Sequence, residues 1–493
     1  AIGAGVAAVN AVRKKNYEGR QGDSPKSTEK KGMPEERKEE LKQFRNTERG
    51  KYEKNSKGIY YTNGNYEAFA RPEKPEGVDG KSAYLVGSGL ASLAAACFLV
   101  RDAQMPGKNI HILEAMDVAG GACDGINDPT RGYVMRGGRE MENHFECLWD
   151  LFRSIPSIET PGVSVLDEYY WLNKHDPNYS LCRATVNRGE DAHTDGKFNL
   201  SQKGCMEIMK LFFTRDEDLY DKTIEDVFDD EVFKSDFWLY WRTMFAFENW
   251  HSALEMKLYF QRFIHHIGGL PDFSALKFTK YNQYESLILP MKKYLEKAGV
   301  KFEFNTEVTN VEFDITGEKK VAKRIICRHK GEEKIIDLTE NDMVFVTNGS
   351  CTESTIYGSH TQAPVGDAEV RTSGVWSLWK NIAKQSPDFG HPEKFCSDIS
   401  KTNWESATVT TSDETIINAI KKICKRDPRT GNVVTGGIVS CKDSKWLLSW
   451  TINRQGQFKE QKKEEVCVWV YSLFTDVPGD YVKKPMKECT GEE

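Results

Sequence analysis

One stretch, residues 84–96, constrains the fold of this chain more than any other. It consists of a short apolar strand, a glycine turn at Gly87 and Gly89, and then an alanine-rich helix. Gly87 permits a tight turn and Gly89 lets the backbone approach a pyrophosphate, which the N–H groups and dipole of the helix start favour. Ser92 takes the third position of the G-x-G-x-x-G pattern and is small enough for close helix–strand packing. The pattern predicts a Rossmann-like nucleotide-binding unit.

A second apolar strand, Asn109–Leu113, ends in an acid, Glu114. This acid lies 27 positions after Gly87 (114 − 87), beyond the usual spacing of about 20 for a ribose-binding carboxylate. Gly120 and Gly121 follow and indicate a second close approach of the backbone to a cofactor, which fits FAD better than NAD. The alternative is an ordinary βαβ unit that holds no nucleotide.

Composition narrows the class of protein. The 493 residues are enough for two or three domains, and the net charge of −6 argues against a general nucleic-acid binder. Twelve cysteines without a C-x-x-C pair indicate reduced, intracellular thiols. No apolar stretch reaches the length of about 20 residues that spans a bilayer. Residues 1–12 are small and apolar and precede Arg13–Lys15, which fits either the cytoplasmic end of a membrane anchor or a frayed terminus.

A glycine- and arginine-rich segment, residues 131–145, follows the nucleotide-binding unit. Arg136 could reach a phosphate or carboxylate, Gly137 and Gly138 would make the loop mobile, and Glu140 could activate water. A solvated charged loop is the plainer interpretation.

Residues 146–299 are rich in aromatics at helical spacing. Glu255, Tyr259 and Phe263 would share one helix face and could line an apolar tunnel, although a packed core tyrosine is the simpler interpretation of Tyr259. His265 and His266 are interpreted as satisfied or exposed histidines. Because the sequence has no H-x-x-H or H-E-x-x-H spacing, we predict no metal site.

The pattern then changes to strands, ending in a buried strand at residues 342–346 and a small-residue turn at Gly349 and Ser350. We therefore expect the chain to leave the nucleotide-binding domain and return to it. In the last third, Thr451 and Asn453 would alternate on one side of a strand, where they could bind a substrate head group or simply face solvent. The fold predicted is α/β: a Rossmann-like FAD-binding domain of the two-part flavoprotein type with an inserted, largely helical substrate domain. We expect a charged tail at residues 1–57, the first part of the FAD-binding domain at 58–145 and a helical substrate region at 146–299. The chain would return to the FAD-binding domain at 300–360. Residues 361–493 would supply substrate-domain strands and the start of a C-terminal region.

Several long motifs resemble the oleate hydratase family, formerly called myosin-cross-reactive antigens. They are AYLVGSGLASLAAACFLVRD, GYVMRGGREMENHFECLWDLF, FENWHSALEMKLYFQRFIHH, LKFTKYNQYESLILP and VTNGS. The resemblance implies a hydro-lyase that adds water across a cis double bond of a long-chain unsaturated fatty acid, typically oleate to 10-hydroxystearate. It implies bound FAD and no net redox change.

The resemblance also implies roles for individual residues. Glu140 matches the carboxylate that positions water, and Tyr259 matches the tyrosine that protonates the alkene. Gln283, Thr451 and Asn453 match substrate-binding residues, mainly at the carboxylate end. Where the family often has histidine, this chain has Gln457. Cofactor contacts are expected from Gly87, Gly89, Ser92, Glu114, Gly120, Gly121, Arg136, Gly137, Gly138, Val308, Gly349 and Ser350, with the loop at Gly137 and Gly138 rearranging when flavin binds.

Two other functions fit the residues without the resemblance. A flavin oxidase or desaturase would give a product lighter by two hydrogens, and a lipid-binding protein would hold fatty acid without turnover. As family members are often dimers that work at membranes, we expect a cytoplasmic homodimer, peripherally associated with the inner membrane surface.

Overall fold

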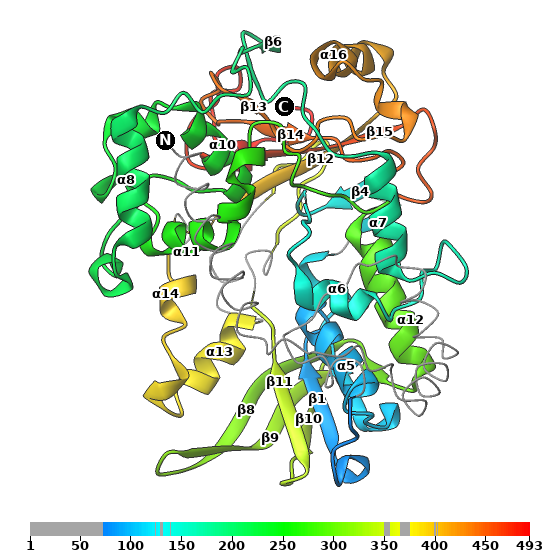
Figure 1. Cartoon of the computed structure of the whole chain (residues 1–493). Helices are drawn as coiled ribbons and strands as arrows, with labels where there is room; N and C mark the ends of the chain where they lie inside the picture. The colour runs from blue at the N-terminus through cyan, green and yellow to red at the C-terminus, as the bar shows by residue number, and fades with distance from the viewer. Residues whose placement is uncertain are drawn as a thin grey trace, which may run out of the picture.

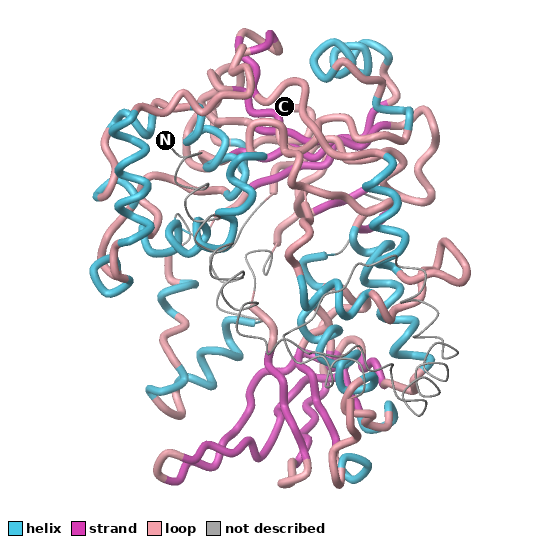
Figure 2. Tube along the Cα trace, in the orientation of Figure 1, coloured by secondary structure: helices cyan, strands magenta, loops and turns pink. Residues whose placement is uncertain are grey.

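The computed structural model describes residues 72–123, 125–128, 132–138, 140–349, 355–364, 375–398, 401 and 403–493. The segment 1–57 and Ser350 lie outside the described residues. Strands gather in two regions, at the bottom and near the top of the molecule as drawn, with most helices beside and between them (Figures 1 and 2). Within the described residues, no helix is both long enough and apolar enough to cross a bilayer.

A parallel four-stranded sheet occupies the lower region (Figure 1). Its order is β11-β1-β2-β7, with bounds Asp342–Val346, Ser82–Val86, Ile110–Leu113 and Lys301–Glu303. All of its pairings are parallel. Because β7 and β11 follow the helical region in sequence, the chain leaves this sheet and returns to it. The predicted α/β, Rossmann-like fold is confirmed.

Both faces of the parallel sheet are covered, which explains its apolar strands. On one face, α5 (Leu90–Arg101), α6 (Glu146–Phe152) and α12 (Leu289–Lys297) share a core with β1 and β2. On the other lie α13 (Val375–Ala383) and an antiparallel meander. The predicted strands after the helical region are confirmed here: the meander consists of β8, β9 and β10 at Thr306–Thr316, Lys319–His329 and Glu332–Asp337.

A six-stranded sheet forms the upper region (Figure 1), in the order β12-β15-β14-β13-β5-β6. Its bounds are Glu405–Thr411, Val466–Ser472, Ser449–Thr451, Val439–Cys441, Ala184–Val186 and Glu190–Asp191. β5 and β6 come from the region predicted to be mainly helical, and β5 pairs in parallel with β13. The sheet therefore joins two distant stretches of the chain.

One strand prediction in the last third is wrong. β14 ends at Thr451, so Asn453 lies in the following loop rather than on the same strand. Both side chains are buried, at 1% and 8% exposure, which also excludes the solvent-facing alternative. β13 starts at Val439 and not earlier, because Gly436 and Gly437 have φ of 70° and 147°, outside strand geometry.

Four of the remaining helices, α7, α8, α10 and α11, begin at serine caps. Ser164, Ser201, Ser235 and Ser252 each accept a hydrogen bond from a backbone N–H in the first helical turn. α11 packs on α10 through stacked aromatic rings, among them Trp241 and Phe260 at 4.3 Å between centroids. The helices are α7 (Val165–His175), α8 (Gln202–Phe213), α9 (Asp230–Phe233), α10 (Asp236–Phe245), α11 (Ala253–Phe263), η6 (Ile264–Gly269), the π-helix η7 (Tyr284–Ile288), α14 (Glu393–Cys396) and α16 (Glu414–Cys424); β3 (Gly125–Asp128) and β4 (Gly132–Met135) form a hairpin.

Candidate active site

The two glycine turns lie against each other at the carboxyl end of β1. Gly87 has φ of 86°, and Gly89 is the N-cap residue of α5. The Gly120 N–H donates to the Ser88 carbonyl over 2.9 Å, and a Cβ on Gly121 would lie 3.0 Å from Gly89 Cα. The backbones of the two turns, at Gly87–Gly89 and Gly120–Gly121, are therefore in direct contact. They lie beside the start of α5, whose first N–H groups have no acceptor within the helix. Such a cradle suits the pyrophosphate of a dinucleotide.

Ser92 and Glu114 hold this cradle in place. Ser92 Oγ lies 2.5 Å from Thr347 Oγ1, which ties α5 to the end of β11. Glu114 is buried, and one oxygen accepts from the Ser88 N–H at 2.8 Å and from its hydroxyl at 2.5 Å. The other oxygen accepts from the Met116 N–H at 2.9 Å. A ribose hydroxyl would be a further partner, since a carboxylate has about four acceptor positions.

Three other predicted cofactor residues, Arg136, Val308 and Gly349, come from later parts of the chain. Arg136 Nη2 donates to the Gly121 carbonyl over 2.6 Å, which connects the loop of Gly137 and Gly138 to the second glycine turn. Val308 is buried in β8 and shares a core with Val86 and Leu113 at the ends of β1 and β2. Gly349 follows β11 with φ of 118°.

The loop that carries Glu140 contacts one predicted substrate residue, Asn453, which in turn contacts a second, Thr451. A Cβ on Gly138 would lie 2.9 Å from Glu140 Oε1, so the carboxylate folds back over Gly138. Asn453 Nδ2 donates to the Gly138 carbonyl over 3.3 Å, and Thr451 Oγ1 lies 3.5 Å from Asn453 Oδ1. Glu140, Thr451 and Asn453 are thus brought together.

Gln283 is the residue immediately before η7. It is buried, and its neighbour Asn282 donates both its backbone and side-chain N–H groups to the Gln457 carbonyl, at 2.8 Å and 3.0 Å. Gln457 is itself buried. The segment that contains Gln283 therefore contacts Gln457, which follows Thr451 and Asn453 in the chain.

Tyr259 lies in α11 among aromatic rings. Its ring centroid is 5.4 Å from that of Phe245, 5.1 Å from that of Phe247 and 6.0 Å from that of Phe263. The ring is partly buried, and the shared face with Phe263 follows the predicted helical spacing.

Glu142 connects the loop to the helix of Tyr259, a role that the sequence analysis missed. It is 2% exposed, and its Oε1 accepts from Arg262 Nη2 over 2.6 Å. Its Oε2 lies 2.7 Å from His266 Nε2 and accepts from the His144 N–H over 2.6 Å. Burial favours the neutral acid, but these hydrogen bonds outweigh it and lower the pKa of Glu142 to about 2. The only sequence signal was a second acid in the motif that contains Glu140.

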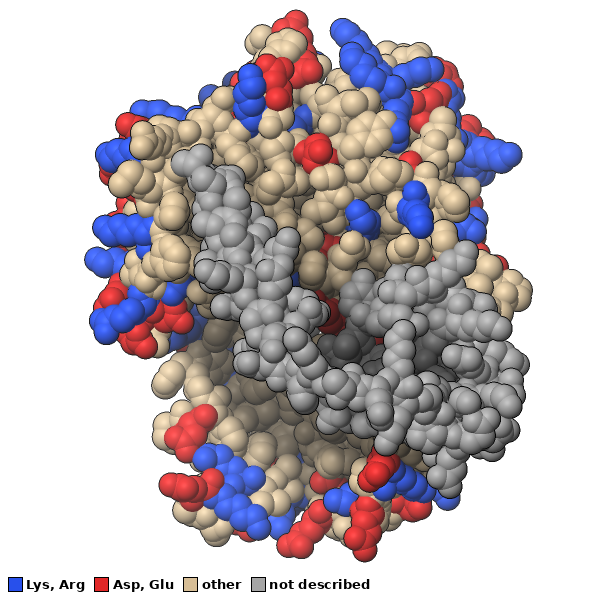
Figure 3. Space-filling view, viewed as in Figure 1, with Lys and Arg blue, Asp and Glu red and all other residues tan. Residues whose placement is uncertain are grey.

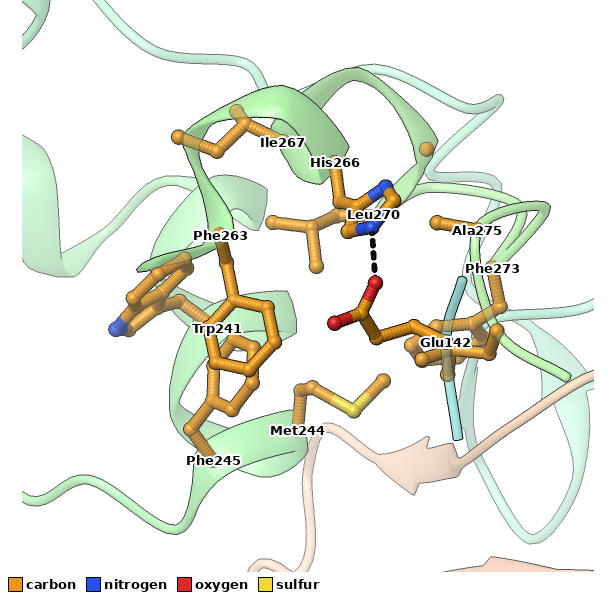
Figure 4. A pocket seen from close by; sticks show the side chains of 12 residues that line it. Glu142, Trp241, Met244, Phe245, Phe263, His266, Ile267, Leu270, Phe273 and Ala275 are labelled. Atoms are coloured by element: carbon orange, nitrogen blue, oxygen red, sulfur yellow. Dashed lines mark hydrogen bonds and ion pairs between the residues drawn. The ribbon is translucent and has the colours of Figure 1, made fainter. Parts of the chain in front are cut away.

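Glu142 and His266 line a cavity of about 30 Å³ whose other walls are mainly apolar (Figure 4). This volume suits one or two water molecules and is too small for an acyl chain. Phe245 and Phe263 line the cavity and also contact the Tyr259 ring. The predicted apolar tunnel stays a prediction.

A cluster of three histidines lies beside Glu142. His144, His265 and His266 each offer one ligand nitrogen, all within 4.8 Å of one another. Partial desolvation beside the neighbouring rings, together with repulsion from His266 and His144, lowers the pKa of the exposed His265 to about 4. Sequence spacing could not reveal this cluster, because His144 is far from the other two in the chain.

A profile of the MCRA family matches residues 80–493. The chain belongs to the MCRA family. Two bacterial proteins are similar to this chain over most of its length. An oleate hydratase of Streptococcus pyogenes serotype M49 is 53% identical over 436 residues, covering 88% of this chain and 73% of the relative. A linoleate hydratase of Lactiplantibacillus plantarum is 29% identical over 439 residues, covering 83% and 76%. The resemblance inferred from the motifs is confirmed.

One solved structure with a related fatty acid name has low similarity to this chain. A fatty acid isomerase from P. acnes that produces CLA has a TM-score of 0.39 at 14% identity, covering 84% of this chain and 81% of the isomerase. That similarity is too low to indicate a shared activity.

Proposed function

We propose that this MCRA protein is an FAD-dependent fatty acid hydratase. It adds water across a cis double bond of a long-chain unsaturated acid, of the type that converts oleate to 10-hydroxystearate, with no net redox change. The observation that carries the proposal is the Glu142–Arg262 ion pair, which holds the loop of Glu140 against the helix of Tyr259. The hydratase names of the two relatives support the same reaction.

In the proposed reaction, Tyr259 acts as the general acid and Glu140 as the general base. An isolated alkene is a very weak base, so its protonation builds carbocation-like charge. Tyr259 donates the proton, and Glu140 accepts a proton from the water that attacks the other carbon. The aromatic rings around Tyr259 exclude bulk water, which strengthens the electrostatic stabilisation of that charge.

Gln283, Thr451 and Asn453 bind the fatty acid carboxylate, which sets the carbon that meets Tyr259. Productive binding requires the Glu140 loop to move. A head group and a double bond in mid-chain lie far apart, whereas Glu140 now folds over Gly138 next to Asn453. Release of the Asn453–Gly138 hydrogen bond would let the loop carry Glu140 toward the double bond.

FAD is the cofactor proposed for the glycine cradle. The backbone approach of Gly89 to Gly121, which a Cβ would block, fits a pyrophosphate, and Arg136 beside it adds positive charge. When bound, the flavin supplies charge and shape beside the reacting carbons rather than electrons. The residues proposed to hold it are Gly87, Gly89, Ser92, Glu114, Gly120, Gly121, Arg136, Gly137, Gly138, Val308, Gly349 and Ser350. The FAD-binding domain would comprise residues 58–145 and 300–360, and the substrate region residues 146–299 and 361–493.

The test is mass spectrometry of oleate incubated with protein and FAD in ¹⁸O-labelled water. We expect labelled hydroxystearate from the native protein and a loss of about 100-fold or more in Glu140→Gln and in Tyr259→Phe. Glu146→Gln and Tyr220→Phe, which change exposed residues of the same types, should retain activity. A product lighter by two hydrogens would identify an oxidase, and bound oleate without turnover a lipid-binding protein; either result contradicts the proposal.

A lipid surface is the proposed place of action. Met206, Met209 and Phe213 form one stripe along α8 and are 64%, 42% and 71% exposed. On the described part of the face in Figure 3, basic and acidic side chains are interspersed, so apolar contact rather than a single-sign field would drive attachment. We expect co-sedimentation with anionic vesicles to fall at least fivefold when these three residues become serine. Equal sedimentation would contradict the proposal. We also propose that the protein is a cytoplasmic homodimer. Light scattering would measure its oligomeric state independently of the vesicle experiment.

A further inference from the structure

The histidine cluster beside Glu142 combines residues from two segments. His144 belongs to the loop before α6, whereas His265 and His266 belong to η6 after α11. Ring centroids are 4.1 Å apart for His144 and His265 and 4.0 Å for His265 and His266. Imidazole nitrogen is a preferred ligand for zinc and its neighbours in the transition series.

Carboxylates already orient two of the three rings. Glu142 Oε2 lies 2.7 Å from His266 Nε2, and Glu146 Oε1 lies 3.2 Å from His144 Nδ1. A ring N–H that donates to a carboxylate leaves the lone pair on the opposite nitrogen, Nδ1 of His266 and Nε2 of His144. Zinc-binding histidines are typically held in this way by a carboxylate on the other ring nitrogen.

We propose that His144, His265 and His266 form a Zn²⁺ site with a water molecule in the fourth position. Bonds of about 2.0–2.1 Å in tetrahedral geometry place ligand nitrogens about 3.4 Å apart. Nitrogens within 4.8 Å reach that spacing by modest rotation of His144 and His265, both of which are exposed. The negative charges of Glu142 and Glu146 partly neutralise the ion. The positive charge of Arg262, which pairs with Glu142, repels it.

Zinc at this site would link the loop that carries Glu140 to η6. The consequence for catalysis rests on the proposed hydratase function: a loop held in this way could not move toward the double bond, so zinc would inhibit. Zinc binding itself does not depend on that function and can be measured without substrate or flavin.

The experiment is a titration of untagged, chelator-treated protein with Zn²⁺ in competition with a chromophoric chelator. We expect one site per chain, and at least a tenfold loss of affinity in both His144→Ala and His265→Ala. His391→Ala, an exposed histidine elsewhere, and Cys147→Ser, an exposed thiol near His144, should bind like the native protein. Thermal melting verifies that each variant is folded. A smaller loss in either cluster variant, or an equal loss in a control, overturns the proposal. If zinc binds as expected but hydration activity is absent, only the proposed function fails.

Discussion

At the scale of single residues, Glu142 is a buried charge with three partners. Glu142→Gln would leave Arg262 and His266 without their anion, and we expect a loss of about 2–3 kcal/mol in the free energy of unfolding, measured by urea titration. Glu146→Gln, which changes a half-exposed carboxylate, should cost less than about 0.5 kcal/mol. Similar losses in both variants would contradict a special role for Glu142.

Glu405, at the start of β12, predicts a pH dependence of stability. Burial raises the pKa of its carboxyl from 4.5 to about 8. Between these values the unfolded chain is ionised while the folded one keeps the proton, so this group lowers stability as pH rises from about 4.5 to about 8. Glu405→Gln should therefore stabilise the protein relative to the native chain by about 3–4 kcal/mol more at pH 8 than at pH 5, in urea unfolding. Glu393→Gln, an exposed control, should show the same small effect at both pH values.

Only those residues of the candidate site that lie within continuous sequence motifs could be predicted from the sequence. Glu140, Tyr259 and the glycines of the cradle belong to continuous patterns. The role of Glu142 and the histidine cluster depend on contacts between the loop and η6, which lie far apart in the chain. No local pattern records such a contact.

At the scale of elements, the paired glycine turns are the feature most sensitive to a single methyl group. Gly121→Ala would place a Cβ 3.0 Å from Gly89 Cα at φ of 54° and push the two turns apart. We expect at least a tenfold weaker binding of FAD, measured by flavin fluorescence. Gly317→Ala has a similar φ of 61° but nothing within 4 Å, so it isolates backbone strain from the clash. FAD binding as in the native protein by Gly121→Ala would argue against the cradle as the flavin site.

Strands were predictable where apolar residues run or alternate over several positions, as in β1, β8 and β15. β5 and β6 were not, because they have only three and two residues and depend on partners far along the chain. β14 ends earlier than its pattern indicates, and the following segment instead provides buried contacts through Asn453 and Arg454.

At the scale of the whole molecule, the two sheets are interlaced by the path of the chain. The parallel sheet takes strands from before and after the helical region, and the six-stranded sheet takes β5 and β6 from within it. Neither sheet can be completed by one continuous segment. Although chains of this size often unfold in stages, this topology favours a single cooperative transition.

Arg454 provides the test of that cooperativity. It is 3% exposed, lies 3.2 Å from Asp176 Oδ2 and donates to the carbonyls of Asp176 and Phe278, which joins the six-stranded sheet to α7 and the segment before η7. Arg454→Met leaves Asp176 with a weaker partner and should cost about 3 kcal/mol. Tryptophan fluorescence and far-UV circular dichroism should report the same urea midpoint in the native protein and shift together in the variant. Arg426→Met removes the more exposed arginine, 3.8 Å from Asp176 Oδ1, and should shift the midpoint much less. Different urea midpoints for the two signals in Arg454→Met would contradict this prediction. They would show that the two sheets unfold independently once the buried Arg454 contacts are lost, and that the path of the chain alone does not couple them.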